Sequence, residues 1–196
     1  MKKIPTLFER VYENHKIVNV LPNFTNEKCK KAFFEGIPTL KIDGSCCSII
    51  DGKFYKRYDA KKGKPIPKNA IKCQEEPDPI TGHLPCWMPV DFNDPSDKWF
   101  INAYQKALEE NDGFLKDGTY EAIGKHFQGN PYNYDYDVLK PHGKIVLDFK
   151  TTPDEDYFNK TKEYITNLNG EGIVFWLDDK PICKIKRTDF NLKWPL

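Results

Sequence analysis

The sequence has no long apolar run, and its six cysteines form no CxxC pair. The first absence argues against a transmembrane helix, and no signal peptide or lipidation motif is found either. We therefore expect an intracellular, cytoplasmic protein with no membrane partner. Cys46 and Cys47 are adjacent within an apolar stretch, which indicates buried thiols in a reducing compartment.

A zinc site has little support in the sequence. Cys73, His83 and Cys86 have the chemistry of zinc ligands, but no second ligand pair with metal spacing lies nearby. The segment between them is rich in proline, which is typical of a loop. We therefore do not expect these three residues to bind zinc.

Neither sign of charge is in excess, because 30 basic residues stand against 29 acidic ones and the formal net charge is +1. A nucleic-acid binder of this composition needs a local basic face, since the field of the whole molecule is weak. The charge therefore neither establishes nor excludes RNA as a substrate. No internal repeat or low-complexity segment is present, and 196 residues are most simply one domain, 1–196, with a substantial core.

The predicted strands come mostly in hairpins, with few helices between them. Asp51-Gly52 between two strand-like runs is a strong signal for a two-residue turn, and a second hairpin turns at residues 178–181. The best-marked helix begins with a capping box formed by Thr152 and Glu155 and ends at Gly170. The other expected helices span 26–35 and 96–111, and the expected strands span 16–21, 39–50, 53–58, 118–124, 144–149, 171–177 and 182–187. This order predicts an α+β fold with antiparallel sheets.

Two further segments carry structural expectations. The helix over 96–111 has an apolar stripe that we expect to pack in the core, formed by Trp99, Ala103, Tyr104, Ala107 and Leu108. Residues 59–95 show little periodicity and are expected to be a long irregular segment, of a kind that is often functional or mobile.

Lys41 interrupts the apolar strand expected over 39–50. Strand periodicity sends Lys41 and Asp43 to one face and Leu40 to the other. One interpretation is a nucleophilic lysine, with Gly44 allowing a phosphate or a backbone segment to come close. The other is a surface lysine paired with an aspartate before a turn. A nucleophilic lysine needs its pKa lowered from about 10.4 toward neutrality, which takes about three units, or roughly 4 kcal/mol, from burial or nearby positive charge.

Lys184 and Lys186 lie two apart on a predicted strand, so their ammonium groups share a face. If that face looks at Lys41, three like charges converge, which is favourable only when a polyanion such as a triphosphate lies among them. The alternative is an exposed strand edge, where lysines discourage aggregation. Glu121 and Glu171 also have two interpretations. They are ligands for a divalent ion or for ribose hydroxyls, or they are solvated acids at strand ends.

Five segments occur in an order that resembles the motifs of covalent nucleotidyltransferases, the superfamily of ATP-dependent DNA ligases, RNA ligases and mRNA capping enzymes. They resemble motifs I, Ib, III, IV and V in turn: KIDG at 41–44, Arg57, EAIG at 121–124, EGIV at 171–174 and KIK at 184–186. A closer resemblance is to the small ATP-dependent 5′–3′ RNA ligases of the vertebrate type. It depends on KIDGSCC at 41–47, GHLPCWMPV at 82–90, GNPY at 129–132, PHG at 141–143 and WP at 194–195, although this chain looks trimmed relative to that family.

The resemblance implies a ligase-type nucleotidyltransferase domain, with antiparallel sheets, flanking helices and a nucleotide pocket between them. By this likeness Lys41 attacks the α-phosphorus of ATP and becomes lysyl-AMP, while Lys184 and Lys186 neutralise the α-phosphate. Glu171 binds Mg²⁺, with Mn²⁺ as an alternative metal. The motif V lysines lie close to the end of the sequence, so we expect no OB domain after them.

The same likeness implies a set of nucleotide-binding residues beyond the lysines. Arg57 contacts phosphate and Glu121 contacts ribose, while Leu40, Asp43 and Gly44 lie around the nucleophile. Either Phe149 or His142 stacks on adenine, and each of these is alternatively a core or turn residue.

The implied partner is RNA with 5′-phosphate and 3′-hydroxyl ends, handled by a monomer that serves RNA repair. The basic residues considered for RNA contact are Lys56, Lys61, Lys62 and Lys64, which are alternatively solvated loop charges. Other functions that remain open are a DNA nick-sealing ligase, a capping-type guanylyltransferase and a non-catalytic nucleotide- or RNA-binding module.

Overall fold

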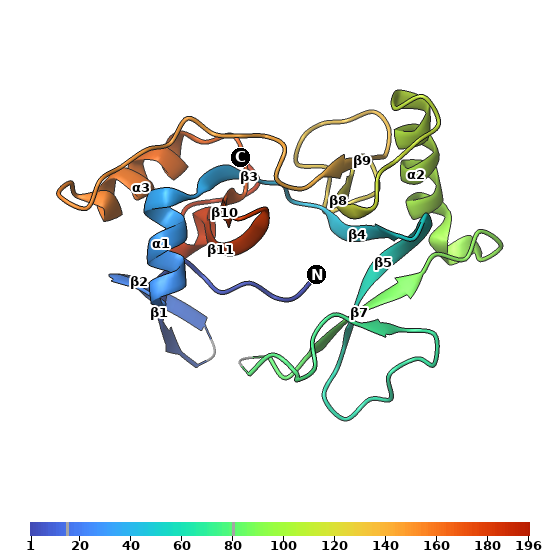
Figure 1. Cartoon of the computed structure of the whole chain (residues 1–196), viewed down its shortest axis with the longest axis horizontal. Coiled ribbons are helices and arrows are strands. Elements are labelled where there is room, and N and C mark those ends of the chain that lie inside the picture. Colours follow the sequence, from blue (N-terminus) through green and yellow to red (C-terminus); the bar gives the residue numbers. More distant parts are fainter. Residues whose placement is uncertain (15, 80) are drawn as a thin grey trace. The chain divides into compact units, whose positions relative to one another are not determined.

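The computed structural model describes residues 1–14, 16–79 and 81–196, and it divides into two compact units (Figure 1). Unit 1 comprises Met1–Lys3 and Asp43–His142, and unit 2 comprises Ile4–Ile42 and Gly143–Leu196. The pairings between the named strands are antiparallel, which confirms the α+β class with antiparallel sheets. The single nucleotidyltransferase domain expected over 1–196 stays a prediction. None of the helices in the described ranges has the length and apolar character needed to cross a membrane.

The boundary between the units falls inside the strand expected over 39–50, so that prediction is wrong. The segment forms two strands, β3 (Ile37–Lys41) and β4 (Ser45–Ile50), which belong to different sheets. Residues 42–44 connect them. An apolar run predicts extended backbone, but it does not reveal where the chain leaves one sheet for another.

Unit 1 is built on a six-stranded sheet of order β6-β7-β5-β4-β8-β9. Its other strands are β5 (Lys53–Ala60), β6 (Ile71–Lys72), β7 (Leu84–Pro89), β8 (Gly118–Ile123) and β9 (Val138–Pro141). The β4–β5 hairpin turns at Asp51 and Gly52, whose φ values of 50° and 70° are those of a left-handed two-residue turn, as predicted.

The strands β7 and β9 were not predicted, and the irregular segment expected over 59–95 therefore contains part of the sheet. Pro85 and Pro89 lie in β7, and Pro141 ends β9, so both strands carry residues that usually argue against a sheet. Residue 80, within that segment, lies outside the described residues.

The helix α2 (Lys98–Glu110) follows a short 3₁₀ helix, η1 (Pro95–Asp97). Ala103 and Ala107 are buried, and Tyr104 stacks on Phe54 with ring centroids 4.8 Å apart, as the apolar stripe predicts. Trp99 is the exception, because it is 36% exposed, so its placement in the core was a wrong prediction.

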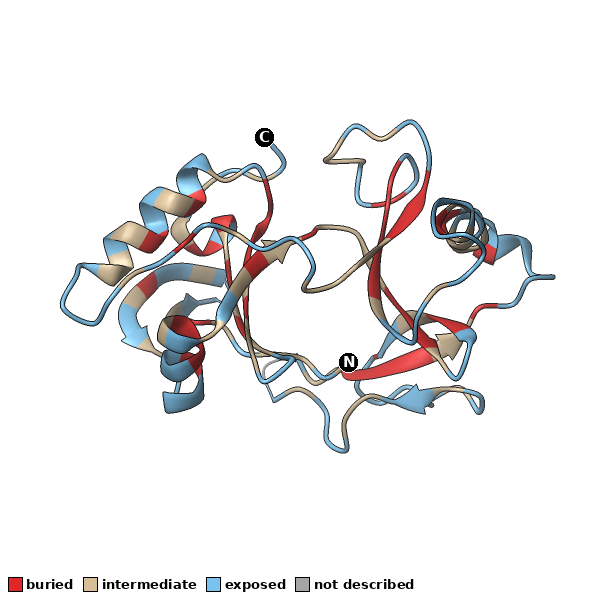
Figure 2. Ribbon diagram, turned by 45° about the horizontal axis from the view of Figure 1, so that its top comes forward, coloured by how far each residue is buried: buried red, intermediate tan, exposed pale blue. Residues whose placement is uncertain are grey.

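Unit 2 holds a three-stranded sheet of order β11-β10-β3, with β10 (Gly172–Leu177) between β3 and β11 (Lys180–Lys186). A separate hairpin pairs β1 (Phe8–Glu13) with β2 (Lys16–Phe24), and a short 3₁₀ helix η2 (Arg187–Phe190) follows β11. The buried core joins sheet, hairpin and helices, and includes Leu7, Phe8, Phe33, Phe149, Ile165, Ile173, Phe175 and Ile185. Figure 2 shows the buried positions along the strands and on one side of each helix.

The helix α1 (Glu27–Glu35) lies where the sequence predicts it, since Asn26 accepts a hydrogen bond from the Cys29 backbone N–H at 2.9 Å. The helix α3 (Tyr157–Asn167) begins later than predicted, because Asp156 is its N-cap and accepts from the Asn159 backbone N–H at 3.1 Å. The Thr152–Glu155 pair exists, with the Thr152 N–H donating to the carboxylate at 2.8 Å, but it closes a turn before the helix.

The strand expected over 144–149 is also wrong. The segment runs along the free edge of β3 without forming a regular ladder. The Leu40 N–H donates to the Ile145 carbonyl at 2.8 Å, and the Leu147 N–H donates to the Pro38 carbonyl at 2.9 Å. Ile145 is 46% exposed, so the apolar residues of this segment do not indicate a buried strand.

Candidate active site

Three lysines that are distant in sequence gather on the sheet of unit 2. Gly172 of β10 pairs with Lys41 of β3 on one side and with Lys186 of β11 on the other. Lys184 lies two residues before Lys186, opposite Val174 of β10. Because side chains two apart on a strand share a face, the sheet brings the three ammonium groups toward one region.

Glu171 is the residue that joins them. One carboxylate oxygen pairs with the Lys41 ammonium, and the other accepts from the Lys186 ammonium at 2.6 Å. The glutamate is 6% exposed. Burial alone would raise the pKa of Glu171, but attraction to Lys41 and Lys186 outweighs burial and lowers that pKa below its ordinary value. The carboxylate is therefore ionised at neutral pH and holds two cations.

Lys184 lies near the same charges but forms no ion pair with a carboxylate among the described residues. Burial, followed by repulsion from Lys41, Lys186 and Arg10, lowers the pKa of Lys184 to about 8, while Glu171 acts in the opposite direction. A bound anion would relieve this repulsion. Buried clusters of like charge with a shifted pKa are common at ligand-binding sites.

Arg10 of β1 was not predicted as part of this region. It donates to the Asp189 carboxylate at 2.5 Å, and that carboxylate also accepts from the Lys186 backbone N–H at 2.8 Å. The Arg10 Nε is buried and has no hydrogen-bond partner among the described residues. No sequence signal identifies Arg10, because it precedes every motif and reaches the site only through the fold.

Gly172 is required by the close approach of β10 and β11. A Cβ atom at this position would lie 2.0 Å from the Ile185 carbonyl oxygen and 2.8 Å from the Lys186 Cα. Both contacts involve backbone, which cannot move away without separating the strands. The glycine of EGIV therefore lets β11, which carries Lys186, pair closely with β10.

The second set of candidate residues belongs to unit 1. Glu121 of β8 is 8% exposed, and its carboxylate lies 2.7 Å from the His142 Nε2. Cys46 of β4 is the cross-strand neighbour of Glu121. Burial, and then the negative charge of Glu121, raises the pKa of Cys46 to about 12, so this thiol is protonated at neutral pH. His142 thus pairs with a carboxylate.

Gly44 allows a backbone segment to come close, which was one of the two expectations for this residue. A Cβ atom there would lie 2.3 Å from the Ala122 carbonyl oxygen and 2.9 Å from the Glu121 Cγ. Gly44 therefore lets β8 come close to the start of β4, which fixes Glu121.

Arg57 belongs to unit 1, on a different strand and in a different sheet from Lys41. It is on β5 opposite Trp87 of β7, whereas Lys41 is on β3 in the other unit. Its guanidinium donates to the Asp59 carboxylate and to the Met1 carbonyl, both at 2.8 Å.

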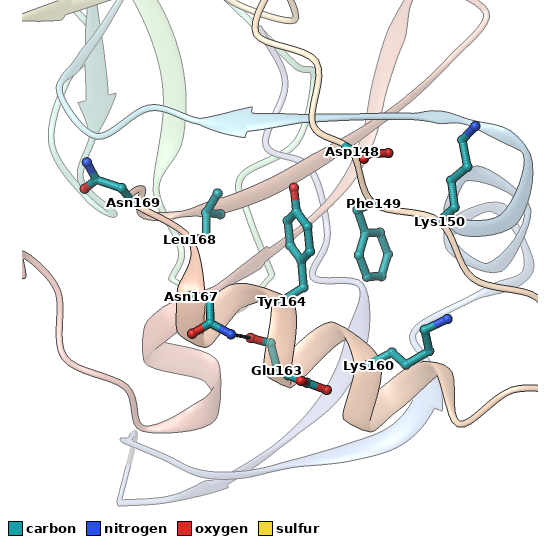
Figure 3. Close-up of a pocket in the computed structure, with 9 residues that line it drawn as sticks. All are labelled: Asp148, Phe149, Lys150, Lys160, Glu163, Tyr164, Asn167, Leu168 and Asn169. Atoms are coloured by element: carbon teal, nitrogen blue, oxygen red, sulfur yellow. Dashed lines mark hydrogen bonds between the residues drawn. The ribbon is translucent and has the colours of Figure 1, made fainter.

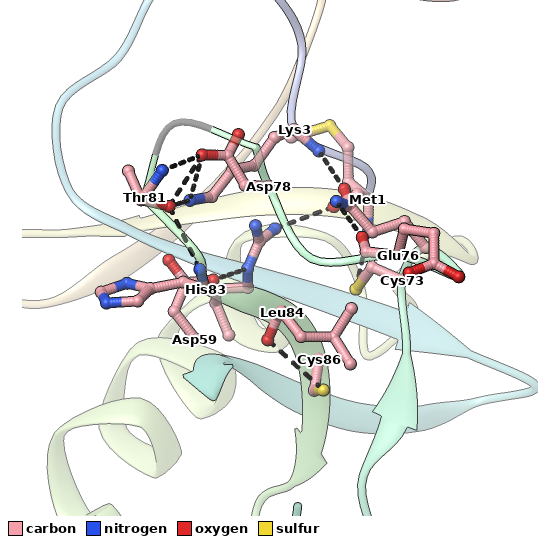
Figure 4. Close-up of polar contacts among 12 residues, drawn as sticks. Met1, Lys3, Asp59, Cys73, Glu76, Asp78, Thr81, His83, Leu84 and Cys86 are labelled. Carbon is pink, nitrogen blue, oxygen red and sulfur yellow. Dashed lines mark hydrogen bonds and ion pairs between the residues drawn. The ribbon is translucent and has the colours of Figure 1, made fainter. Parts of the chain in front are cut away.

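The loop around Cys73 and His83 is tied to the N-terminal residues of unit 1 (Figure 4). The Met1 amino group donates to the Cys73 sulfur at 3.4 Å, and the Lys3 ammonium donates to the Thr81 hydroxyl at 2.8 Å. The Cys86 thiol donates to the Leu84 carbonyl at 3.6 Å. Cys86 is buried in β7, so the loop that the sequence indicates between these residues ends at a strand.

Phe149 occupies the core of unit 2. It is 6% exposed and packs on Phe33, Tyr164 and Phe175, with centroid distances of 5.8, 5.0 and 6.3 Å. Phe149 and Tyr164 also border a cavity of about 440 Å³ (Figure 3). Phe149 therefore packs in the core of unit 2, and its stacking on adenine stays a prediction.

Among the lysines considered for RNA contact, Lys56 pairs with the buried Asp97 carboxylate. Lys61, Lys62 and Lys64 are exposed. Lys56 therefore has a structural partner, whereas the other three lysines are on the surface.

No protein-family model matches the chain. It is similar to proteins named RNA ligase 1 from vertebrates. The Danio rerio protein is 26% identical, with 81% of this chain and 68% of that protein covered. The Rattus norvegicus protein is 26% identical, with 93% and 76% covered, and the Pongo abelii protein is 24% identical, with 83% and 70% covered. The alignment with the Danio rerio protein extends over 223 positions, more than the 196 residues of this chain, so the relative has inserted segments.

Proposed function

Because the chain is a distant relative of vertebrate RNA ligases, we propose that it is an ATP-dependent RNA ligase. It joins RNA 5′-phosphate and 3′-hydroxyl ends through lysyl-AMP and RNA-adenylate intermediates. The observation that carries the proposal is the gathering of Lys41, Lys184 and Lys186 about one buried carboxylate.

In the first step the neutral amine of Lys41 attacks the α-phosphorus of ATP. A P–N bond forms, the bond from the α-phosphorus to the bridging oxygen breaks, and pyrophosphate leaves, while the amine releases a proton to solvent. Lys184 and Lys186 neutralise the charge that builds on the phosphoryl oxygens, which is the main catalytic device for such a transfer. The Lys41 side chain is 20% exposed and is therefore reachable.

Glu171 has two roles in this scheme. In the free protein it orients Lys41 as the partner of its ammonium group. Its ionised carboxylate is also a ligand type that Mg²⁺ prefers, and Mn²⁺ accepts the same donors. Nucleotide phosphates are new anionic partners for Lys41 and Lys186. When these lysines turn to the phosphates, the Glu171 carboxylate is left to bind such an ion. When bound, the metal stabilises negative charge on the phosphates.

The remaining steps return Lys41 to its starting state. An oxygen of the RNA 5′-phosphate attacks the phosphorus of lysyl-AMP, the P–N bond breaks, and the amine takes up a proton from solvent. The RNA 3′-hydroxyl then attacks the activated 5′-phosphate and releases its proton to solvent, a phosphodiester forms, and AMP leaves. Atoms and charges balance without any further reactant.

We assign the other predicted residues to nucleotide binding within this proposal. Glu121 contacts the ribose and Arg57 a phosphate, and Leu40, Asp43 and Gly44 adjoin the nucleophile. RNA binding by Lys61, Lys62 and Lys64 is part of the same proposal, supported by their exposure.

Intact-mass measurement after incubation with ATP and Mg²⁺ tests the proposal. We expect one added AMP on the wild type and on Lys31→Ala, whose lysine is exposed on α1, and none on Lys41→Ala. Absence of the adduct on the wild type under varied pH and metal conditions would refute it. An adduct with GTP in place of ATP would favour a capping enzyme, and sealing of nicked DNA in place of RNA would favour a DNA ligase. Nucleotide binding by calorimetry without an adduct would favour a binding module.

A further inference from the structure

Cys46, Glu121 and His142 of unit 1 offer three different metal-ligating groups at one place. The thiol sulfur, a carboxylate oxygen and an imidazole nitrogen all lie within 4.8 Å of one another. Tetrahedral Zn²⁺ holds such atoms at about 2.0–2.3 Å, which puts the ligands about 3.3–3.8 Å apart. Side-chain adjustments of about 1 Å would therefore bring all three onto one ion.

The backbone fixes this group of residues before any ligand binds. Cys46 and Glu121 are direct cross-strand partners in the β4–β8 ladder. The His142 N–H donates to the Thr119 carbonyl of β8 at 3.1 Å, directly after the β8–β9 ladder. A site built on paired strands needs little reorganisation when it takes up a ligand.

The contact between His142 and Glu121 already holds two of the ligand atoms side by side. The His142 Nε2 lies 2.7 Å from a Glu121 carboxylate oxygen, and a cation that replaces the shared proton would bind both atoms. The imidazole proton is then on Nδ1, which is buried and for which the described part of the chain supplies no partner.

We propose that Cys46, Glu121 and His142 form a binding site for a divalent cation that accepts thiolate and imidazole ligands, represented by Zn²⁺. This donor set suits Zn²⁺ and related transition metals and does not suit Mg²⁺, which prefers oxygen ligands. The cation displaces the thiol proton, which passes to solvent. Three protein ligands leave a fourth coordination position open.

One consequence rests on the proposed function. Glu121 is there the contact to the ribose of the nucleotide, so the cation and ATP compete for the same carboxylate. We therefore expect Zn²⁺ to inhibit formation of lysyl-AMP, with relief at higher ATP concentration.

Cobalt(II) is the probe for the site, because a thiolate bound to it gives a charge-transfer absorption band. Metal-free protein titrated with Co²⁺ should show this band at one equivalent. Cys46→Ser should lose the band and weaken binding at least tenfold, since even residues that only support ligands change metal affinity by about 10–100-fold. Cys47→Ser is the matched control, because that thiol donates to the Ser45 carbonyl at 3.3 Å and a hydroxyl can do the same. A wild type without the band, or a Cys46→Ser variant that keeps it, would overturn the proposal.

A measurement on the wild type covers the case in which Cys46→Ser does not fold. Alkylation followed by peptide mass spectrometry should show Cys46 protected by Zn²⁺ and Cys73 unaffected. Equal labelling of Cys46 with and without Zn²⁺ would contradict the site.

The AMP adduct gives a separate readout of the competition. Zn²⁺ should suppress it in the wild type and in Cys47→Ser, but not in Cys46→Ser. Equal inhibition of Cys46→Ser would rule the competition out. A protein that never forms the adduct but gives the cobalt band would remove the proposed function and leave the metal site in place.

Discussion

Replacing Lys184 by methionine should make the protein more stable and less active. The folded state lowers the pKa of Lys184 from 10.5 to about 8, through burial and then through repulsion from Lys41 and Lys186. At 1.36 kcal/mol per pKa unit, this difference corresponds to about 3 kcal/mol by which the charged lysine opposes folding at pH 7. Methionine keeps an unbranched apolar side chain but carries no charge, so the variant should gain roughly this amount of stability.

The pH dependence of stability tests whether the charged Lys184 opposes folding. Below pH 8 the lysine is charged in both states and opposes folding fully, whereas above about 10.5 it is neutral in both and opposes nothing. The difference between variant and wild type in the free energy of unfolding should therefore be largest near pH 7. It should shrink toward zero as the pH rises from 8 to 10.5.

Urea unfolding at several pH values measures this difference, and Lys186→Met is the matched control. Lys186 pairs with the buried Glu171, so its loss should destabilise the protein by about 1–3 kcal/mol. Both variants should lose the AMP adduct. A Lys184→Met protein that is no more stable than the wild type at pH 7, or a difference that does not change with pH, would refute the reasoning.

Other positions give simpler expectations. Gly172→Ala should destabilise unit 2 and reduce AMP adduct formation, because the added Cβ would meet the Ile185 carbonyl oxygen at 2.0 Å, and unfolding together with intact mass would show both effects. Asn26→Ala should cost about 0.5–2 kcal/mol through loss of the α1 cap, measured by urea unfolding, and an unchanged midpoint would contradict the cap. Asp97→Ala should cost about 3–5 kcal/mol, because it leaves the Lys56 ammonium without its buried partner; Asp94→Ala, whose carboxylate is exposed, is the control and should cost clearly less.

Local patterns predicted those elements whose signals are short-range. The two-residue turn at Asp51-Gly52, the Asn26-capped helix and the hairpin that carries Lys184 all depend on neighbouring residues, and the structure has each of them. The strands β7 and β9 were missed because their prolines weaken the local signal, while pairing with partners far along the chain forms them anyway. The helix α3 starts late because two N-terminal cap signals occur close together and only packing selects between them.

The sequence by itself determined the chemistry available to this protein: which amines, carboxylates and thiols it has, and that lysines two apart on a strand share a face. Only the tertiary structure decided that Gly172 lies between Lys41 and Lys186, that Glu171 holds both ammonium groups, and that Arg10 joins them. It also decided that Cys46 meets Glu121 across two strands. The physical reason is that residue types fix charge and reactivity, whereas strand register over long sequence separations fixes which of those groups come within reach of one another.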